Sequence, residues 1–438
     1  MWIENVEILR RLEERGGKVD YVSQRVRYPP EVVERFLADS EKLDWDTLTP
    51  TVTASSGVYS GLYHEPGSSE LAPWTEERLA TYFALARALP NVDGASMLGC
   101  PLGVTPQLGP LYERYYCWKY GARESGTIHL DELCPYIHEL YQLRAQQLGK
   151  PLGDVFRGTL YLVPPLKLGR HEAHQFLYFW ERGLQVQIGD MYAMGATSPV
   201  TLAGSIALSL AEQFAVGILQ RAFFGSTCFG LNSSISVMDM RTMIYPYGRP
   251  EMALTNMAVA QMARYYALPF SGHAGLSDAK LPSCEVGAQK ALTAIPTLLA
   301  GGRAHLDVGL LSIDEVCSPV QMILDDEFCG ALRHLCAEFG SSEEELALDL
   351  IDEVGPGGNF MATEHTARRF RREHWEPRVW SRQMLAPWLA SGRQLDVDAA
   401  ASLCREIASD LDVTPRLSAD EERDVVRLIE GARRHLDY

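Results

Sequence analysis

The sequence lacks several features that would assign it to a membrane or to the outside of a cell. Its longest unbroken apolar runs fall well short of the roughly 20 residues that a membrane-spanning helix needs. The opening residues, MWIENVEILRRLEERGG, are charged and amphipathic, and they lack the apolar centre of a secretion signal. The nine cysteines form no CxxC pairs and have no regular spacing, which is typical of reduced thiols. Together these absences predict a cytoplasmic protein.

Positive charge is also scarce. The formal net charge is −17, which argues against a duplex nucleic-acid partner because such a partner requires a basic face. One local exception is the segment 365–382, which is rich in arginine and tryptophan. Two interpretations of it stay open: a solvated helix face, which is the commoner case, or a docking surface for an acidic partner.

Motifs for dinucleotide and metal binding are missing as well. No GxGxxG turn follows an early strand, so a doubly wound open sheet with a dinucleotide site is disfavoured. The sequence contains no HxH, HExxH or paired-cysteine spacing, and its 11 histidines are dispersed. We therefore predict no metal bound by the protein itself.

What the sequence does contain is a regular alternation of strand-like and helical segments after Pro50. The eight expected strands are Val52–Val58, Gly94–Cys100, Gly126–Leu130, Thr159–Val163, Leu184–Tyr192, Thr227–Val237, Leu268–Gly275 and His305–Leu311. Helical segments are expected between them near 75–89, 106–120, 131–147, 170–182, 199–222, 250–266 and 285–300. Eight such repeats predict a (β/α)8 TIM barrel, which typically needs about 250 residues.

The barrel is expected to carry helical extensions at both ends. We predict an N-terminal helical segment over 1–49, the barrel over 50–324 and a C-terminal helical region over 325–438. Ser418 and Glu421 have the spacing of a capping box for the last helix. The C-terminal region is expected to cap the barrel or to contact another subunit, so an oligomer is predicted.

Reactive groups in such a barrel belong at the carboxyl ends of its strands. This rule selects polar and aromatic residues after the first, third, fifth, sixth, seventh and eighth strands, and aromatic side chains are common near these strand ends. Thr197 and Ser198 also fit the N-cap of the helix that follows, with Pro199 in its first turn. For Lys280 a surface ion pair with Asp278 is the plainer interpretation.

Four blocks of this sequence, in the same order, are similar to one known family. They are Gly195–Ser205 (GATSPVTLAGS), Arg249–Ser283, Val320–Phe328 and Gly355–Arg378, and the likeness extends from about residue 5 to the C-terminus. The chain thereby resembles the trimethylamine methyltransferase (MttB) superfamily. It resembles the branch without pyrrolysine, because only the 20 standard residues occur. It departs from the family pattern at its shorter N-terminus and at Asn359, where histidine is expected.

The resemblance implies a TIM barrel and a corrinoid-dependent methyltransferase. Such an enzyme moves a methyl group from a tertiary or quaternary methylated amine, such as glycine betaine, to Co(I) of a corrinoid (cobalamin) on a separate corrinoid-binding protein. An aromatic cage is suited to a quaternary ammonium, because each ring face attracts the cation by about 0.5–2 kcal/mol. The segment 365–382 would then be a docking site for the corrinoid protein.

The candidate site residues divide into three roles under this interpretation. The candidate catalytic residues are Asp190, Glu315 and His273. The candidate substrate-binding residues are Tyr192, Phe229, Tyr247, Phe360, Arg249 and Lys280, in which the rings form the cage and the cations, with His273, pair with a betaine carboxylate. The candidate corrinoid contacts are Gly195, Thr197, Ser198 and Asn232. The place of pyrrolysine corresponds to the stretch Gly309–Ser318.

Two alternatives remain open at this stage. One is a lyase or aldolase on the same barrel that uses Lys280 or Lys290 as a Schiff-base amine. The other is a non-catalytic protein that binds a quaternary amine.

Overall fold

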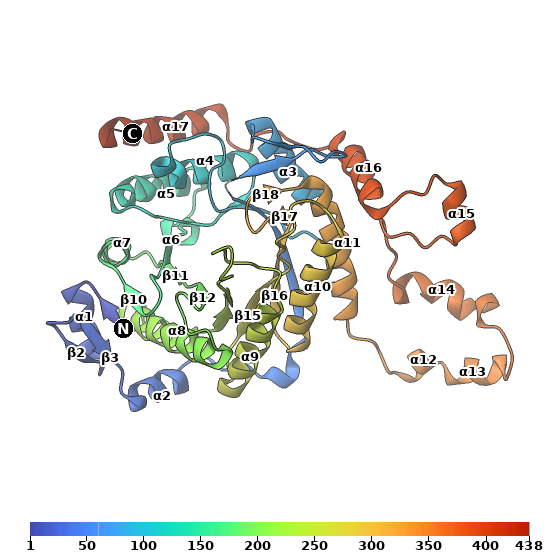
Figure 1. Ribbon diagram of the computed structural model, residues 1–438, viewed down its shortest axis with the longest axis horizontal. Coiled ribbons are helices and arrows are strands. Elements are labelled where there is room, and N and C mark those ends of the chain that lie inside the picture. Colours follow the sequence, from blue (N-terminus) through green and yellow to red (C-terminus); the bar gives the residue numbers. More distant parts are fainter. Residues whose placement is uncertain (60, 438) are drawn as a thin grey trace.

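Eight strand positions form a closed parallel ring in the computed structural model, which describes residues 1–59 and 61–437 (Figure 1). In chain order the strands are β4 (Thr51–Val58), β7 (Ala95–Met97), β8 (Arg123–Glu124), β9 (Thr159–Tyr161), β11 (Gln187–Gly189) continued by β12 (Tyr192–Met194), β13 (Leu231–Ser233) continued by β14 (Ile235–Val237), β15 (Phe270–Ala274) and β16 (Arg303–Val308). Each strand pairs in parallel with the next one in this order, and β16 pairs with β4 to close the ring. The third and fourth strands are joined by a bridge between Thr127 and Thr159. The predicted (β/α)8 barrel is therefore confirmed.

Helices surround the strands (Figure 1). They are α3 (Glu76–Ala88), α4 (Gly109–Tyr120), α5 (Cys134–Leu148), α7 (Arg170–Trp180), α8 (Leu202–Phe224), α9 (Pro250–Tyr266), α10 (Cys284–Leu299) and α11 (Pro319–Leu335). Each follows its strand and runs back along the outside of the ring, as right-handed βαβ units do. The short helix α6 (Leu152–Val155) and the 3-10 turns η2 (Pro106–Leu108) and η3 (Asp131–Leu133) lie in the connections.

The fifth barrel helix, α8, is long and apolar enough by length and composition to cross a membrane. In this fold it packs against the barrel instead, and half of its most apolar window is buried. Its apolar character follows from that packing, since a barrel helix presents one face to the strands and its sides to neighbouring helices.

The N-terminal segment is not purely helical. Besides α1 (Val6–Glu14), α2 (Pro30–Ala38) and the turn η1 (Trp45–Thr47), it contains the strands β1 (Trp2–Ile3), β2 (Lys18–Asp20) and β3 (Arg25–Arg27). These strands form a small sheet that β10 (Lys167–Leu168) joins from the barrel region. The prediction of helices alone over 1–49 is corrected in this respect, because strands of two or three residues give too little periodicity to be recognised.

A second small sheet lies beside the carboxyl ends of the first and eighth barrel strands. It contains β17 (Leu310–Leu311), β18 (Val316–Cys317), β5 (Leu62–His64) and β6 (Leu71–Ala72), in that order. The stretch from β17 to β18 includes Ser312 and Ile313, both with positive φ. This tight connection fixes the loop that carries Asp314.

The elements after residue 325 are helical. They are α12 (Glu343–Leu346), α13 (Leu348–Val354), the turn η4 (Phe360–Ala362), α14 (Glu364–Glu373), α15 (Leu385–Ala390), α16 (Asp396–Ala408) and α17 (Ala419–Leu436). The expected boundary between 324 and 325 falls inside α11, so the eighth barrel helix extends into the expected C-terminal region. The capping box of Ser418 and Glu421 is present at the start of α17.

Two apolar cores flank the barrel wall, one under α4, α5, α7 and α8 and the other under α3, α10, α11 and α16. The interior of the ring is different, because polar side chains project into it from several strands. That polar interior is where the candidate site lies.

Candidate functional site

A cavity of about 380 Å³ occupies the inside of the barrel. It is lined from the fourth to the eighth strands by Thr159, Tyr161, Gln187, Ile188, Gly189, Asp190, Asn232, Ser233, Ser234, Ser271, His273 and His305. Alternation along the strands explains much of this lining, since every second residue of a barrel strand faces inward. Among the residues that the structure describes, no lysine or arginine lines this cavity.

Two histidines and one carboxylate form the wall of the cavity at the seventh and eighth strands. His273 on β15 donates from Nε2 to a carboxylate oxygen of Asp307 on β16. The ring of His305 lies 6.2 Å from that of His273, and its nitrogens contact the hydroxyls of Thr53 at 3.1 Å and Ser55 at 3.4 Å.

These groups differ in their charge. Burial lowers the pKa of His273, but the Asp307 carboxylate and its hydrogen bond outweigh burial and raise it. Burial likewise raises the pKa of Asp307, and the positive His273 reverses this and lowers it. Burial lowers the pKa of His305, and the positive charge of His273 adds to the fall although Asp307 opposes it. The wall therefore holds a His273–Asp307 ion pair beside a neutral His305.

Asp190 lies on the opposite side of the cavity, directly after β11. Its carboxylate accepts a hydrogen bond of 2.9 Å from the hydroxyl of Tyr192. Burial raises the pKa of Asp190 to about 7, although the hydrogen bond from Tyr192 opposes the rise. Glu212 on α8 lies behind this pair, and burial raises its pKa too. Asp190 therefore changes its charge near neutral pH, within reach of the cavity.

A second carboxylate with a raised pKa lies above the histidines. Asp314 accepts a hydrogen bond of 2.9 Å from the hydroxyl of Tyr247, whose ring is 6.2 Å from that of His273. Burial raises the pKa of Asp314 to about 6, although the hydrogen bond from Tyr247 opposes the rise. Burial also raises the pKa of Tyr59, and the nearby Asp314 adds to that rise.

Tyrosine rings surround these two carboxylates. Tyr161 lines the cavity, and Tyr245 packs edge-on against Tyr247 at 5.5 Å. Burial raises the pKa of Tyr161 to about 12, with a further contribution from Tyr59. The tyrosines therefore remain neutral, with their rings available to a bound cation.

A buried ion pair supports the end of the eighth strand from outside the cavity. Lys290 on α10 donates to Asp325 on α11 at 2.7 Å and to the backbone oxygen of Asp307 at 3.0 Å. Asp325 also accepts from the backbone N–H of Gly309 at 2.7 Å. Both residues are almost fully buried. The pair fixes the backbone on either side of the point where β16 presents Asp307.

This arrangement suits a small organic cation. Carboxylates that ionise near neutral pH attract positive charge, and neutral tyrosine rings offer their negative faces to it. The ion pair of His273 with Asp307 adds a positive group on one side, which suits a ligand that also carries a carboxylate.

Four of the sequence-predicted residues are brought together here. Asp190, His273 and Asn232 line the cavity, and Tyr247 packs against His273 through its ring. Tyr192 comes next to the site but is fully buried, so it holds Asp190 rather than lining a cage. The backbone of Asn232 is fixed by Gln213, which leaves its side chain facing the cavity.

The two predicted phenylalanines lie elsewhere. Phe229 comes at the amino end of the sixth strand and packs against Phe36 of α2, with ring centroids 4.9 Å apart. Phe360 belongs to the turn η4 in the C-terminal region, outside the barrel. Neither ring is placed at the cavity described above.

The predicted cations and Glu315 are occupied by other contacts. Arg249 forms an ion pair with Glu251 at 3.1 Å, and Lys280 is exposed and donates to the backbone oxygen of Asp278 at 2.6 Å. Glu315 is exposed and accepts from the hydroxyl of Ser312 at 3.0 Å, while its neighbour Asp314 is the residue that faces Tyr247.

The GATSP loop after β12 closes on itself. Gly195 has a φ of +89°, a backbone conformation that favours glycine over residues with a side chain. Thr197 accepts from the N–H of Ala193 at 2.9 Å, and Ser198 is hydrogen-bonded to Ser205 at 2.6 Å. The suggestion that Thr197 or Ser198 caps α8 is wrong, because that helix begins at Leu202 with Thr201 as its N-cap.

Sequence reasoning missed Asp307, His305, Tyr161 and Glu212. His305 and Asp307 alternate along β16 with buried apolar residues, and this period-two pattern was the available signal. Among the described residues, no group of three or more His, Cys, Asp or Glu side chains is arranged to hold a metal ion.

Comparisons with known proteins agree with these observations. The family model "Trimethylamine methyltransferase (MTTB)" matches residues 154–435. The chain is 30% identical over 405 residues to trimethylamine methyltransferase MttB of Desulfitobacterium hafniense (strain DSM 10664 / DCB-2), covering 89% of this chain and 81% of the relative. It is 32% identical over 227 residues to glycine betaine methyltransferase of D. hafniense (strain Y51), covering 52% of this chain and 47% of that relative. The chain is 28% identical over 278 residues to trimethylamine methyltransferase MttB of Methanosarcina barkeri, covering 64% of this chain and 56% of that relative.

Proposed function

Since the chain belongs to the trimethylamine methyltransferase (MttB) family, we propose that it transfers a methyl group from a quaternary methylated amine to a corrinoid on a partner protein. The observation that carries this proposal is the cavity itself. Asp190, whose pKa is raised, and the ring of Tyr161 line a space that no described lysine or arginine lines. Asp314, whose pKa is also raised, lies beside it, bonded to Tyr247, whose ring packs against His273.

The reaction needs little acid–base chemistry from the protein. A quaternary ammonium has no lone pair to protonate, and it leaves as a neutral tertiary amine once its methyl group is taken by a nucleophile. The chain's task is to hold the cation, exclude water and present one methyl group outward. The carboxylates of Asp190 and Asp314 and the tyrosine rings can bind the cation.

A betaine is the substrate class that we favour. Its carboxylate would approach His273, which is positively charged in its pair with Asp307, while its ammonium lies toward Asp190. A cavity of about 380 Å³ accommodates such a small molecule.

The corrinoid is too large for this cavity and must approach its mouth from outside. The mouth has a suitable docking surface, because exposed apolar side chains follow the carboxyl ends of four strands. This mouth rim consists of Tyr59, Tyr161, Val163, Met191, Met240, Met243 and Ile244. Exposed apolar patches of this kind mark interaction sites, and methionine adapts readily to a partner. We propose that the corrinoid-binding protein docks here.

The nine cysteines are all unpaired, which agrees with the proposed cytoplasmic location. The Schiff-base alternative is not supported by the two lysines. Lys280 is exposed and outside the cavity, and Lys290 is buried in its ion pair with Asp325.

The test is methyl transfer to cob(I)alamin from a panel of amines: glycine betaine, proline betaine, carnitine, trimethylamine and choline. We expect the absorbance of the methylated corrinoid to appear with at least one quaternary amine. A protein that only binds amines would retain them while the cobalt spectrum stays unchanged. An imine trapped by borohydride with a carbonyl substrate would support a lyase instead.

A further inference from the structure

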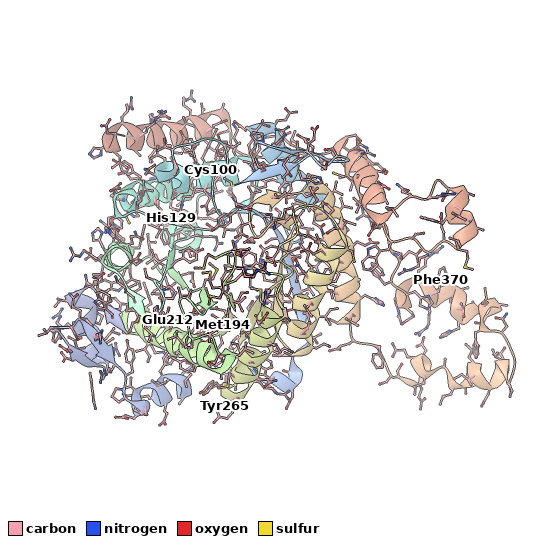
Figure 2. All side chains as sticks on the ribbon, in the orientation of Figure 1. Cys100, His129, Met194, Glu212, Tyr265 and Phe370 are labelled. Carbon is pink, nitrogen blue, oxygen red and sulfur yellow. The ribbon has the colours of Figure 1, made fainter. Side chains whose placement is uncertain are left out.

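The barrel holds a second cavity next to that of the candidate site. This lower chamber has a volume of about 300 Å³, and its polar lining includes Ser55, Ser96, Arg123, Arg157, Gln185 and Gln187. It adjoins the cavity described above, because Thr159, Gln187 and His305 line both spaces. The strands around them lie at the centre of Figure 1, and Figure 2 shows side chains projecting inward from these strands.

The lower chamber lies toward the amino ends of the strands, opposite the mouth. Arg123 is the first residue of β8, Arg157 comes two residues before β9, and Gln185 comes two residues before β11. Bulky branched side chains normally fill the interior of a TIM barrel. Here the small side chains of Ser55 on β4 and Ser96 on β7 leave a space instead. Catalysis in such barrels takes place at the carboxyl ends of the strands, so the proposed methyl transfer does not account for this space.

Two arginines bring positive charge to the lower chamber. Arg123 and Arg157 both line it, and neither guanidinium forms an ion pair or a hydrogen bond with another residue that the structure describes. Arg123 faces the interior of the barrel, since its charge adds to the fall that burial causes in the pKa of His305. Two positive groups that face one small space repel each other, and an anion between them removes that repulsion.

The lower chamber has no acid of its own to neutralise these arginines. Among the described residues that line it, Glu124 is the only acid. Glu124 follows Arg123 along β8, so its side chain points to the opposite face of the strand. There its carboxylate accepts a hydrogen bond of 3.0 Å from the hydroxyl of Tyr141 on α5, outside the ring of strands. The positive charge inside the ring is therefore uncompensated.

Two glutamines add neutral hydrogen-bond donors. Gln185 and Gln187 are two residues apart on an extended segment, so both point to the same face, and both line the lower chamber. Neither side-chain amide is hydrogen-bonded to another part of the described chain. Amide and guanidinium N–H groups both donate to oxygen, and a guanidinium can bind two oxygens of one anion at once.

We propose that the lower chamber is a second binding site, which takes a small oxyanion such as phosphate or a carboxylate. Two free guanidiniums and two free amides converge on a space of about 300 Å³, which suits an ion of a few heavy atoms. The cation site is separate, because Asp190 lines only the upper of the two spaces. The proposal does not depend on the methyl-transfer activity.

The test is calorimetric titration of the full-length protein with sodium phosphate and, separately, with sodium acetate, at an ionic strength held constant with sodium chloride. We expect one site per chain for at least one of the two anions, and the stronger binder identifies its class. In the double variant Arg123→Gln/Arg157→Gln the affinity should fall about tenfold or more, because hydrogen bonds from charged groups are lost. The matched control Arg170→Gln, at an exposed arginine that opens α7, should bind like the wild type.

A further variant locates the bound anion. His273 is positively charged but lines only the upper cavity, so His273→Gln should keep the anion affinity within about twofold of wild type. Both substituted arginines are exposed, so circular dichroism should show that the double variant is folded. A wild type that binds neither anion would overturn the proposal. So would an arginine variant that binds like the wild type, which would indicate an adventitious ion only, or loss of binding in His273→Gln alone.

Discussion

The hydroxyl of Tyr247 donates a hydrogen bond of 2.9 Å to Asp314, joining the loops that follow the sixth and eighth barrel strands. On the other side of the cavity the hydroxyl of Tyr192 does the same for Asp190, also at 2.9 Å. Two tyrosines thus hold two carboxylates at the mouth of one barrel. Burial keeps both pKa values high, so a bound cation and a bound proton compete for the same oxygens.

This competition predicts a pH dependence of amine binding. Asp190 and Asp314, with pKa values of about 7 and about 6, are neutral at pH 5 and mostly charged at pH 8. A permanent cation binds the charged form better, so its affinity should rise as pH increases through 6 to 7 and level off above 8. We expect a gain of about tenfold or more, measured by calorimetry with tetramethylammonium, which does not titrate. An affinity that is flat or falls over this range would contradict the assignment.

Neutralising either carboxylate should weaken binding. For Asp190→Asn and Asp314→Asn we expect the dissociation constant of the amine that proves to be the substrate to rise about 10- to 100-fold, equivalent to about 1.4–2.8 kcal/mol. Each variant should also lose its own part of the pH dependence. Asp154→Asn, at an exposed carboxylate on α6, is the matched control and should bind like the wild type. If the control and the site variants behave alike, the two carboxylates do not hold the cation.

Tyr161 tests whether a ring face, rather than a hydroxyl, contributes to the hold. Cation–π attraction needs the ring only, so Tyr161→Phe should bind amine within about twofold of wild type. Tyr161→Ala should lose about 0.5–2 kcal/mol, or about 2- to 30-fold in affinity. Calorimetry on the two variants separates these effects, and equal losses in both would point to the hydroxyl.

The regular part of the molecule was predictable from sequence because repetition supports it. Eight alternations of strand and helix constrain one another, so errors of a few residues, such as the third strand beginning at Arg123 rather than Gly126, did not affect the fold. The capping box of Ser418 and Glu421 was predictable because it depends on residues three apart in the chain.

The candidate site was less predictable because small irregularities decide which way a side chain faces. The fifth strand breaks at Asp190 and Met191, between β11 and β12. Asp190, within this break, faces the cavity, whereas the side chain of Tyr192, at the start of β12, is buried next to it. Phe360 depends on the path of a long exposed arm, for which the sequence offers no local signal. His305 and Asp307 lie within a strand, so a rule that selects residues after strands passes over them.

The Lys290–Asp325 pair gives a prediction on stability. Lys290→Met would leave the Asp325 carboxylate buried without its cation, and we expect the free energy of unfolding to fall by about 3–5 kcal/mol. The double variant Lys290→Met/Asp325→Leu removes both charges and should recover much of that loss. Denaturant unfolding of the three proteins measures the difference. A single variant as stable as wild type would show that the pair does not support the end of β16.

The mouth rim allows docking of the corrinoid-binding protein to be separated from the chemistry. Met191 lies in the break of the fifth strand and Met243 follows the sixth strand. Both side chains are exposed and neither lines the cavity, so Met191→Glu and Met243→Glu should leave the cavity intact. We expect the KM for the corrinoid-binding protein to rise about tenfold or more, because a charge on an apolar interface opposes its burial. The rate with free cob(I)alamin should stay within about twofold of wild type, since a small acceptor needs no such surface. Leu335→Glu, at an exposed leucine that ends α11 at the opposite end of the barrel, serves as the control away from the rim. An equal loss with both acceptors would mean that the rim shapes the cavity itself, and no loss with either would place the partner on another surface.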